Sequence, residues 1–156
     1  MINIKIRLIF LCTISVLSTL TFSKEPNQMT KKIISTENEP QAIGPYSQAV
    51  KAGNLMFISG QIPLNPKTGD LVSDSIEEQA KQVLNNVQSI CEAAGYSLDD
   101  IVKISIFLTD LSNFGIVNDV MKEYFSEPYP ARATVEVSAL PLDVNVEIEA
   151  IVLING

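Results

Sequence analysis

Few residues in this 156-residue chain can do chemistry, because it contains no histidine and only two arginines. The missing histidine removes the usual general base, the Ser/His and Cys/His nucleophile systems and histidine-ligated zinc. Arg7 lies in an apolar leader, whereas Arg132 follows a proline-bounded turn at the start of an expected strand. The planar guanidinium of Arg132 suits a carboxylate held at two points. A surface role or a structural ion pair is an equally weighted alternative for Arg132.

Three glutamates on the last two expected strands are the next candidates, namely Glu136, Glu147 and Glu149. Solvated strand residues are the simplest interpretation, and we favour it for Glu136 and Glu149. One of the three carboxylates could instead be buried and position a water molecule, a task that needs no histidine.

Five further residues are candidates either for a site or for packing. Tyr46 follows Gly44-Pro45 and either packs on the sheet or walls a pocket. Ser59-Gly60 ends an expected strand, where glycine permits close approach of a ligand to main-chain N–H groups or marks a bend. Asn118, in the second expected helix, could make a polar contact to a loop. Cys91 lies beside an apolar helical stripe and is expected to be a buried core thiol.

Hydrophobic periodicity places these residues on strands and helices. The first helix is expected over 75–94, with Asp74 as its N-cap and Gly95 as its stop. The second helix is expected over 113–125. Strands are expected over 32–36, 49–51, 55–59, 101–109, 131–138 and 146–154. The order β-β-β-α-β-α-β-β predicts a two-layer α+β domain, with two helices on one face of a mixed sheet of about six strands.

The other face of this sheet would be uncovered, yet its residues are not uniformly polar. In the last strand Val146, Ile148 and Ala150 alternate with a set that also contains apolar Ile151 and Leu153. A sheet face of that kind usually packs against another subunit, so we expect a closed homo-oligomer. Loops covering the face are the alternative.

Residues 1–23 have the pattern of a secretory signal peptide. Lys5 and Arg7 give a basic start, residues 8–22 form an uncharged and mostly apolar run, and Ser23 fits a small-residue exit. The run is short for a membrane span, so a retained anchor is the weaker interpretation. Cleavage would make the protein periplasmic or secreted, and the mature form would not be bound to a membrane. Translation from Met29 would instead make it cytoplasmic.

Cleavage would leave residues 24–30 as a flexible N-terminal segment before a single domain over 31–156. Removing residues 1–23 leaves nine basic and eighteen acidic residues, a net charge of −9 and a single cysteine, Cys91. One cysteine forms no internal disulfide. The acidic balance, without a basic stripe, argues against a nucleic-acid partner, because binding a phosphate backbone needs clustered lysine and arginine.

Four segments carry a resemblance to a known family. They are AIGPYSQA at 42–49, SGQIP at 59–63, PARATVEV at 130–137 and VEIEA at 146–150. In this order they closely resemble the motifs of the reactive intermediate deaminase family (RidA), also called the YjgF/YER057c/UK114 family. The likeness runs from about Lys31 to Leu153 and leaves the leader outside.

This resemblance implies a chorismate-mutase-like fold and a homotrimer whose clefts lie between subunits, with no metal and no cofactor. It implies hydrolysis of reactive 2-imino and enamine acids to 2-keto acids and ammonia. The substrates would be 2-aminoacrylate/2-iminopropanoate and 2-iminobutanoate, as in a 2-iminobutanoate/2-iminopropanoate deaminase. A non-enzymatic trimer that binds or senses a small carboxylate metabolite is the alternative, since the same cleft would serve binding equally well.

Matched by position, the resemblance implies that Arg132 binds the substrate carboxylate and that Glu147 helps to place the attacking water. It places Tyr46 and Ser59-Gly60 beside the substrate, and Asn118 at a further cleft position. At Thr134 many members carry cysteine. A thiol-dependent role is therefore excluded here, while the main-chain carbonyl of Thr134 can still help to hold the water.

Overall fold

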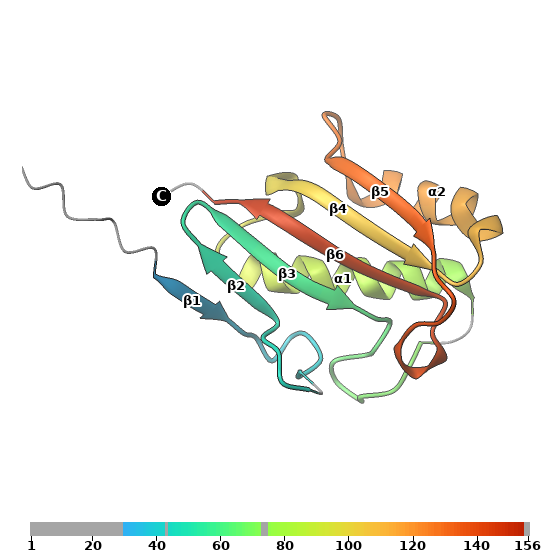
Figure 1. Cartoon of the computed structure of the whole chain (residues 1–156), viewed down its shortest axis with the longest axis horizontal. Coiled ribbons are helices and arrows are strands. Elements are labelled where there is room, and N and C mark those ends of the chain that lie inside the picture. Colours follow the sequence, from blue (N-terminus) through green and yellow to red (C-terminus); the bar gives the residue numbers. More distant parts are fainter. Residues whose placement is uncertain (1–29, 43, 73–74, 155–156) are drawn as a thin grey trace, which may run out of the picture.

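The computed structural model describes residues 30–42, 44–72 and 75–154. Figure 1 shows one sheet crossed by two helices. The six strands are β1 (Lys31–Ile34), β2 (Ala49–Ala52), β3 (Leu55–Gln61), β4 (Ile101–Leu108), β5 (Ala131–Glu136) and β6 (Val146–Leu153). The helices are α1 (Ile76–Ala93) and α2 (Phe114–Tyr124). The predicted order of elements is confirmed, with each element bounded within a few residues of its expected range.

The sheet has the strand order β1-β2-β3-β6-β4-β5, so the last strand of the chain lies in its middle. Neighbouring strands are antiparallel except for β4 and β5, which run parallel and are joined through α2. The sheet is therefore mixed, as predicted. Strand β5 forms one edge and carries Arg132.

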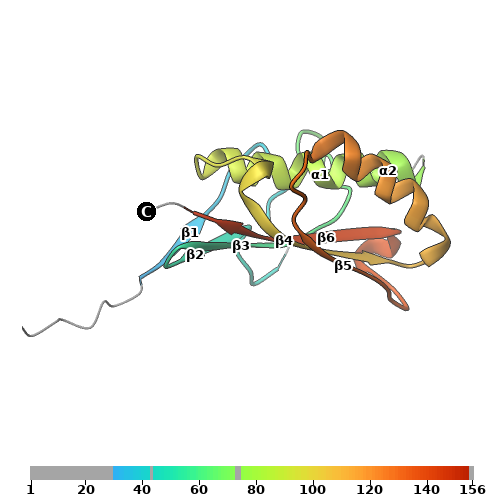
Figure 2. The ribbon, with the colours of Figure 1, turned by 90° about the horizontal axis from the view of Figure 1, so that it is seen from above.

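Both helices lie on one side of the sheet, and the opposite side is uncovered (Figure 2). The apolar stripe of α1 is fully buried against the strands, and the thiol of Cys91 lies with it. The β6 side chains that face this layer are buried as well. The buried apolar residues of α1 and β6 are Ala80, Val83, Leu84, Val87, Ile90, Cys91, Val146, Ile148, Ala150 and Val152. The predicted two-layer α+β architecture is confirmed.

The start of α1 differs from the expected one. Its N-cap is Ser75 rather than Asp74, and the Ser75 hydroxyl accepts a hydrogen bond of 3.2 Å from the backbone N–H of Glu78. Asp74 itself lies outside the described residues. Both residue types are good caps, and the sequence alone does not fix which of two neighbours ends the extended segment. The helix ends before Gly95, whose φ of 83° supplies the left-handed turn expected there.

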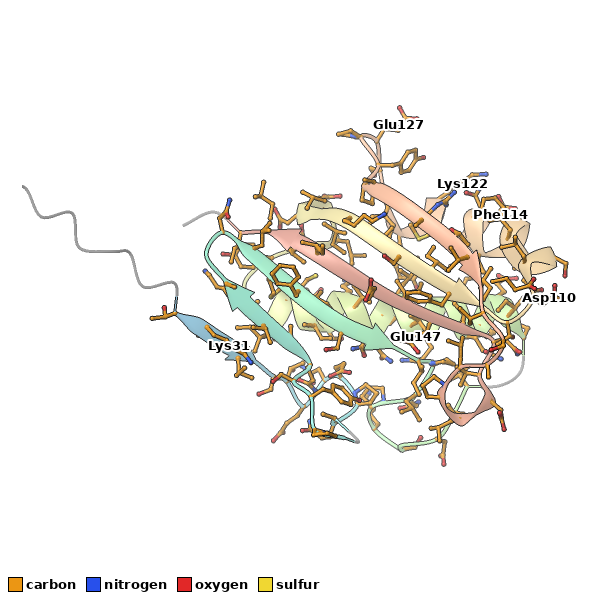
Figure 3. All side chains as sticks on the ribbon, viewed as in Figure 1. Lys31, Asp110, Phe114, Lys122, Glu127 and Glu147 are labelled. Atoms are coloured by element: carbon orange, nitrogen blue, oxygen red, sulfur yellow. The ribbon has the colours of Figure 1, made fainter. Side chains whose placement is uncertain are left out.

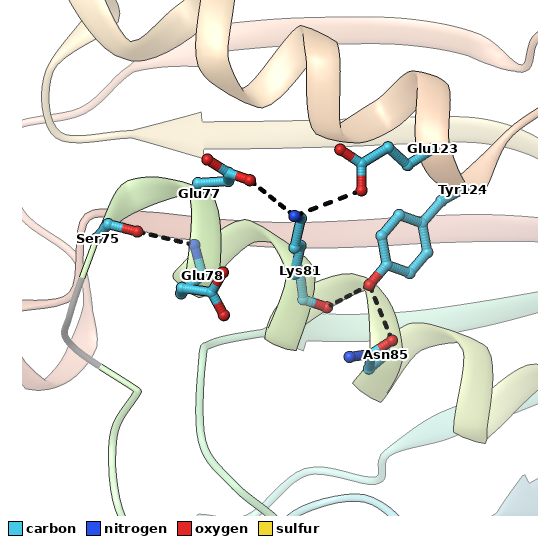
Figure 4. Close-up of polar contacts among 7 residues, drawn as sticks. All are labelled: Ser75, Glu77, Glu78, Lys81, Asn85, Glu123 and Tyr124. Carbon is cyan, nitrogen blue, oxygen red and sulfur yellow. Dashed lines mark hydrogen bonds and ion pairs between the residues drawn. The ribbon is translucent and has the colours of Figure 1, made fainter.

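Polar contacts fasten α2 to α1 (Figure 4). The Tyr124 hydroxyl donates to Asn85 Oδ1 at 3.0 Å and contacts the Lys81 carbonyl at 3.3 Å. Lys81 Nζ pairs with Glu77 at 2.7 Å and with Glu123 at 3.4 Å. These contacts set the position of α2 over the sheet, and α2 carries residues that contact Arg132.

Large apolar side chains lie on the uncovered side of the sheet. The pairing register aligns Ile33, Val50, Phe57 and Ile151 across four strands. Ile33 and Phe57 keep 48% and 44% of their surface exposed in the single chain. Exposed apolar side chains gathered on one face are typical of a subunit contact. The homo-oligomer expected from this face remains a prediction.

Candidate active site

One pocket opens at the end of β3, next to the uncovered face. It is lined by residues from four separate parts of the chain: Tyr46, Ser59, Gly60, Ile62, Pro141 and Glu147. We call it the Glu147 pocket. Glu147 projects from β6 on the side of the sheet toward the viewer in Figure 3. The pocket joins four residues that the sequence singled out, Tyr46, Ser59, Gly60 and Glu147, with two that it did not.

Gly60 lies in a β-bulge and directly against the Glu147 side chain. Ile58 pairs with Ala150 and Gln61 pairs with Ile148, so Ser59 and Gly60 together face one β6 residue. Ser59-Gly60 therefore lies inside β3 and does not end it. A Cβ built on Gly60 would overlap the Glu147 carboxylate and would lie 2.8 Å from its Cδ. Glycine is required here for close approach of the carboxylate to the backbone.

Hydrogen bonds from β3 hold the loop that carries Tyr46. The Ser59 hydroxyl donates to the Ser47 carbonyl at 2.7 Å, and the Ser59 N–H donates to the Gln48 carbonyl at 3.0 Å. The buried Gln48 side chain accepts from the Thr36 N–H and donates to the Thr36 and Pro40 carbonyls. The Ser59 side chain thus positions the pocket wall instead of pointing freely into the pocket.

Partial burial sets the charge behaviour of Glu147. Burial raises the pKa of its carboxyl above the ordinary value, and the negative charge of Glu149 adds to the rise. A carboxyl with a raised pKa is a stronger proton acceptor once ionised, which suits a group that draws a proton from water. The exposed position of Glu149 confirms the solvated strand residue expected there.

A second pocket surrounds Arg132 on the helix side of β5. It is lined by Asn118, Met121, Lys122, Tyr129, Pro130 and Arg132. We call it the Arg132 pocket. Arg132 Nη1 donates to Asn118 Oδ1 at 2.9 Å, and the guanidinium carbon lies 5.2 Å from the centre of the Phe114 ring. Asn118 therefore contacts a strand side chain, where the sequence suggested a contact to a loop.

Arg132 has no acidic partner in the part of the chain that the structure describes. The ion pairs within residues 30–42, 44–72 and 75–154 join lysines to acids, and Lys122 of the same pocket pairs with Asp119 at 2.7 Å. The structural ion pair offered as an alternative for Arg132 is absent from these residues. The guanidinium is left with donors for an external carboxylate.

Thr134 lies two residues beyond Arg132 on β5 and shares its face of the strand. Its hydroxyl oxygen is buried and has no hydrogen-bond partner among the described residues. A buried hydroxyl without a hydrogen-bond partner is unusual, and an ordered water molecule commonly supplies the missing hydrogen bond.

The two pockets lie on opposite faces of the sheet. Arg132 pairs in register with Ile104, whose side chain is fully buried under the helices. Glu147 pairs with Phe107, which belongs to the alternate set and points to the uncovered side. A single chain therefore separates Arg132, Asn118 and Thr134 from the residues of the Glu147 pocket.

Sequence reasoning did not single out Phe114, which contacts Arg132, or Ile62 and Pro141, which line the Glu147 pocket. Phe114 precedes Asn118 by four residues on α2, so helical spacing could have placed both on one face. The Asn86 amide donates to the Ile62 and Leu64 carbonyls at 3.2 and 3.0 Å and so fixes the Ile62 loop. That long-range contact has no signal in the local sequence.

The remaining reactive group is a core residue. The Cys91 thiol is fully buried, and burial raises its pKa to about 12. It stays protonated and unreactive at neutral pH, as expected for a core thiol. Within the described residues no three side chains of metal-binding type are grouped together.

The fold and the pockets define a two-layer α+β protein. It has an arginine without an acidic partner among the described residues on an edge strand, and a half-buried glutamate on the uncovered sheet face. The sequence identifies the family. Residues 36–154 match the model of the family described as Endoribonuclease L-PSP, and the chain belongs to this family, which is the YjgF/RidA family. The resemblance noted from its four motifs is confirmed.

Curated relatives and solved structures agree with this assignment. A RutC family protein of Pyrococcus horikoshii is 57% identical over 78% of this chain and 96% of its own length. A 2-iminobutanoate/2-iminopropanoate deaminase of Escherichia coli is 52% identical over 77% of this chain and 95% of its own length. The crystal structure of RidA from an Antarctic Psychrobacter has a TM-score of 0.76 and 51% identity, covering 79% of this chain and 99% of that chain.

Proposed function

We propose that this protein is a 2-iminobutanoate/2-iminopropanoate deaminase, which hydrolyses reactive 2-imino acids to 2-keto acids and ammonia. The observation that carries the proposal is the Arg132 guanidinium, which is held by Asn118 and has no acidic partner among the described residues. A relative that is 52% identical bears the name of this activity. The carboxylate of an imino acid supplies the missing counter-charge.

The chemistry needs few protein groups because the substrate is already electrophilic. Arg132 binds the carboxylate at two points, and water adds to the imine carbon while Glu147 accepts a proton from it. As the new C–O bond forms, the C=N π pair moves to nitrogen, which takes up a proton, and a carbinolamine results. A second proton then reaches the amino nitrogen, and the C–N bond breaks with its electron pair going to nitrogen. The hydroxyl group gives up its proton to solvent as the C=O bond forms, so ammonia leaves and the 2-keto acid remains. The main-chain carbonyl of Thr134 helps to hold the water.

This mechanism requires Arg132 and Glu147 in one cleft, although a single chain places them on opposite faces of the sheet. A homotrimer in which the Arg132 pocket of one subunit meets the Glu147 pocket of its neighbour meets the requirement. Two features support such an assembly: the apolar side chains of the uncovered face and the free edge of β5.

A coupled assay tests the activity. A threonine dehydratase generates 2-iminobutanoate, and the formation of 2-ketobutanoate is followed with and without the protein. We expect acceleration by the wild type, and at least a hundredfold loss in Arg132→Ala, because hydrogen bonds between charged groups are strong and the substrate carboxylate would be left unpaired. Absence of acceleration, or an Arg132→Ala variant as active as the wild type, would contradict the proposal.

The same materials separate this activity from the non-enzymatic alternative. A binding protein would be stabilised against heat by 2-ketobutanoate without accelerating imine hydrolysis. The word endoribonuclease in the family description raises RNA cleavage as well. The net charge of −9 that remains without the leader disfavours an RNA backbone as ligand. Salt-sensitive binding of RNA by a nuclease-free preparation would reopen that possibility.

We also propose that residues 1–23 direct export to the periplasm or the cell exterior, on the basis of their basic and apolar pattern. These residues lie outside the described part of the chain. None of the described helices is both long and apolar enough to cross a bilayer. Determining the N-terminus of the native protein tests the proposal. A first residue near Lys24 supports export, whereas a first residue at Met29 or Thr30 supports a cytoplasmic protein.

A further inference from the structure

The Arg132 guanidinium is held on two sides by one helix. Asn118 Oδ1 accepts a hydrogen bond of 2.9 Å from Nη1, and the Phe114 ring lies under the guanidinium carbon at 5.2 Å. Phe114 and Asn118 are one helical turn apart on α2, so both face β5. Figure 3 shows Phe114 on α2, behind the sheet.

This arrangement leaves one edge of the guanidinium for a ligand. Arginine has five N–H donors in a fixed plane, and Asn118 takes one of those on Nη1. Within the described residues Nε and Nη2 make no hydrogen bond, and together they form an edge that matches the two oxygens of a carboxylate. The cation–π contact with Phe114 restricts the orientations that the guanidinium can adopt.

We propose that Phe114 and Asn118 are positioning residues that pre-orient Arg132 for two-point binding of the substrate carboxylate. The inference rests on the proposed function, and it changes the role of Asn118 from a cleft residue that contacts substrate to one that acts through Arg132. An exposed arginine has many rotamers, and fixing one of them before binding removes an entropic penalty from the binding step.

The neutrality of Asn118 is part of the arrangement. An amide oxygen accepts one N–H without offering a charge, so it orients the guanidinium and leaves its positive charge for the substrate. An aspartate at the same position would form an ion pair with Arg132 and would compete with the substrate carboxylate. Asn118→Ala, which removes the hydrogen bond, and Asn118→Asp, which keeps the shape but adds a charge, therefore have distinct expected outcomes.

The experiment compares Phe114→Leu, Phe114→Tyr, Asn118→Ala and Asn118→Asp in the full chain, with Ile116→Ala as a control on the solvent-exposed part of the same helix. KM and kcat for 2-iminobutanoate are measured together with the Kd of 2-ketobutanoate by calorimetry. We expect Phe114→Leu to raise KM and Kd about two- to fivefold, and Phe114→Tyr, which keeps the ring, to restore wild-type values. Asn118→Ala raises both about tenfold, and Asn118→Asp raises them further.

The readouts separate positioning from a structural role. Positioning predicts changes in KM and Kd with nearly constant kcat, and rescue by the tyrosine variant, with unchanged melting temperatures. Equal constants in wild type and Phe114→Leu, or an Asn118→Asp variant that binds as well as Asn118→Ala, would overturn the inference. A wild type without turnover would instead contradict the proposed function, while calorimetry of 2-ketobutanoate would still test the positioning.

Discussion

The carboxylate of Glu147 lies directly over the backbone of Gly60, so closely that a single methyl group at position 60 would overlap it. This contact lies at the β-bulge where Ser59 and Gly60 of β3 together face Glu149 of β6. The position of the proposed proton acceptor is therefore set by the absence of a side chain on the neighbouring strand. A glycine in this motif is explained by packing against a functional group, without any unusual backbone angle.

Gly60→Ala should displace the Glu147 carboxylate while leaving the fold intact. We expect kcat/KM to fall about ten- to a hundredfold, because small misplacements of a reacting group have effects of this size. The coupled imine assay measures the fall, and thermal unfolding checks the fold. Gly115→Ala is the matched control, since a Cβ at Gly115 meets nothing within 4 Å. Equal activity of the two variants would argue against a role for the Gly60–Glu147 contact.

The pKa of Glu147 should control the acidic limb of the rate profile. Burial, with help from Glu149, raises this pKa, and only the ionised carboxyl accepts a proton from water. Catalysis is therefore lost as pH falls through the raised pKa. Glu149→Gln removes the smaller contribution and should move the limb to lower pH.

The measurement is the ratio of catalysed to uncatalysed hydrolysis at each pH, because imine hydrolysis is itself pH-dependent. High salt screens the charge of Glu149 and should shift the wild-type limb in the same direction. High salt should not shift the acidic limb of the Glu149→Gln variant, because the charge that it screens is already gone. If neither Glu149→Gln nor high salt moves the acidic limb, a group other than Glu147 controls it.

Glu39 should make stability fall as pH rises toward neutrality. Its side chain is only 4% exposed, one carboxylate oxygen has no hydrogen-bond partner among the described residues, and burial raises its pKa from 4.5 to about 7. A carboxyl whose pKa is raised on folding favours the folded state below its unfolded pKa, and that contribution is lost as pH rises through the folded pKa. The contribution of Glu39 to the free energy of unfolding therefore changes by about 3 kcal/mol between acidic pH and pH values above its folded pKa.

Glu39→Gln keeps the shape of the side chain and removes its titration. Denaturant unfolding at a series of pH values between 4 and 8 should show the variant gaining stability over the wild type as pH rises. Titration of the remaining groups is common to both proteins and cancels in the comparison. A constant difference across this range would mean that Glu39 titrates normally. Glu39 lines a small cavity with Tyr46 and Gly60, so a looser loop would also reach the Glu147 pocket.

The sequence predicted most of the fold and several residues of the two pockets, but not that the two pockets lie on opposite faces of the sheet. Periodic apolar positions place α1 and the strands, since burial of one face is a local signal. The insertion of β6 between β3 and β4 depends on pairing between distant segments. So does the parallel register that turns Arg132 toward the helices. The burial of Glu39 likewise depends on distant contacts, because the Gln48 amide donates to the neighbouring Thr36 and Pro40 carbonyls.

Mixing two inactive variants should restore activity if the site is formed between subunits. Arg132→Ala lacks the carboxylate anchor, and Glu147→Gln lacks the proton acceptor, but each keeps the half-site that the other has lost. In a cyclic trimer every mixed ring contains one junction with both half-sites intact, so about a third of the sites in purified mixed rings should be restored. The two chains are co-expressed with different affinity tags, and rings that carry both tags are purified and assayed. Activity in these mixed rings requires Arg132 and Glu147 to act from neighbouring chains. Rings as inactive as the parent variants would place both residues of each site within one chain.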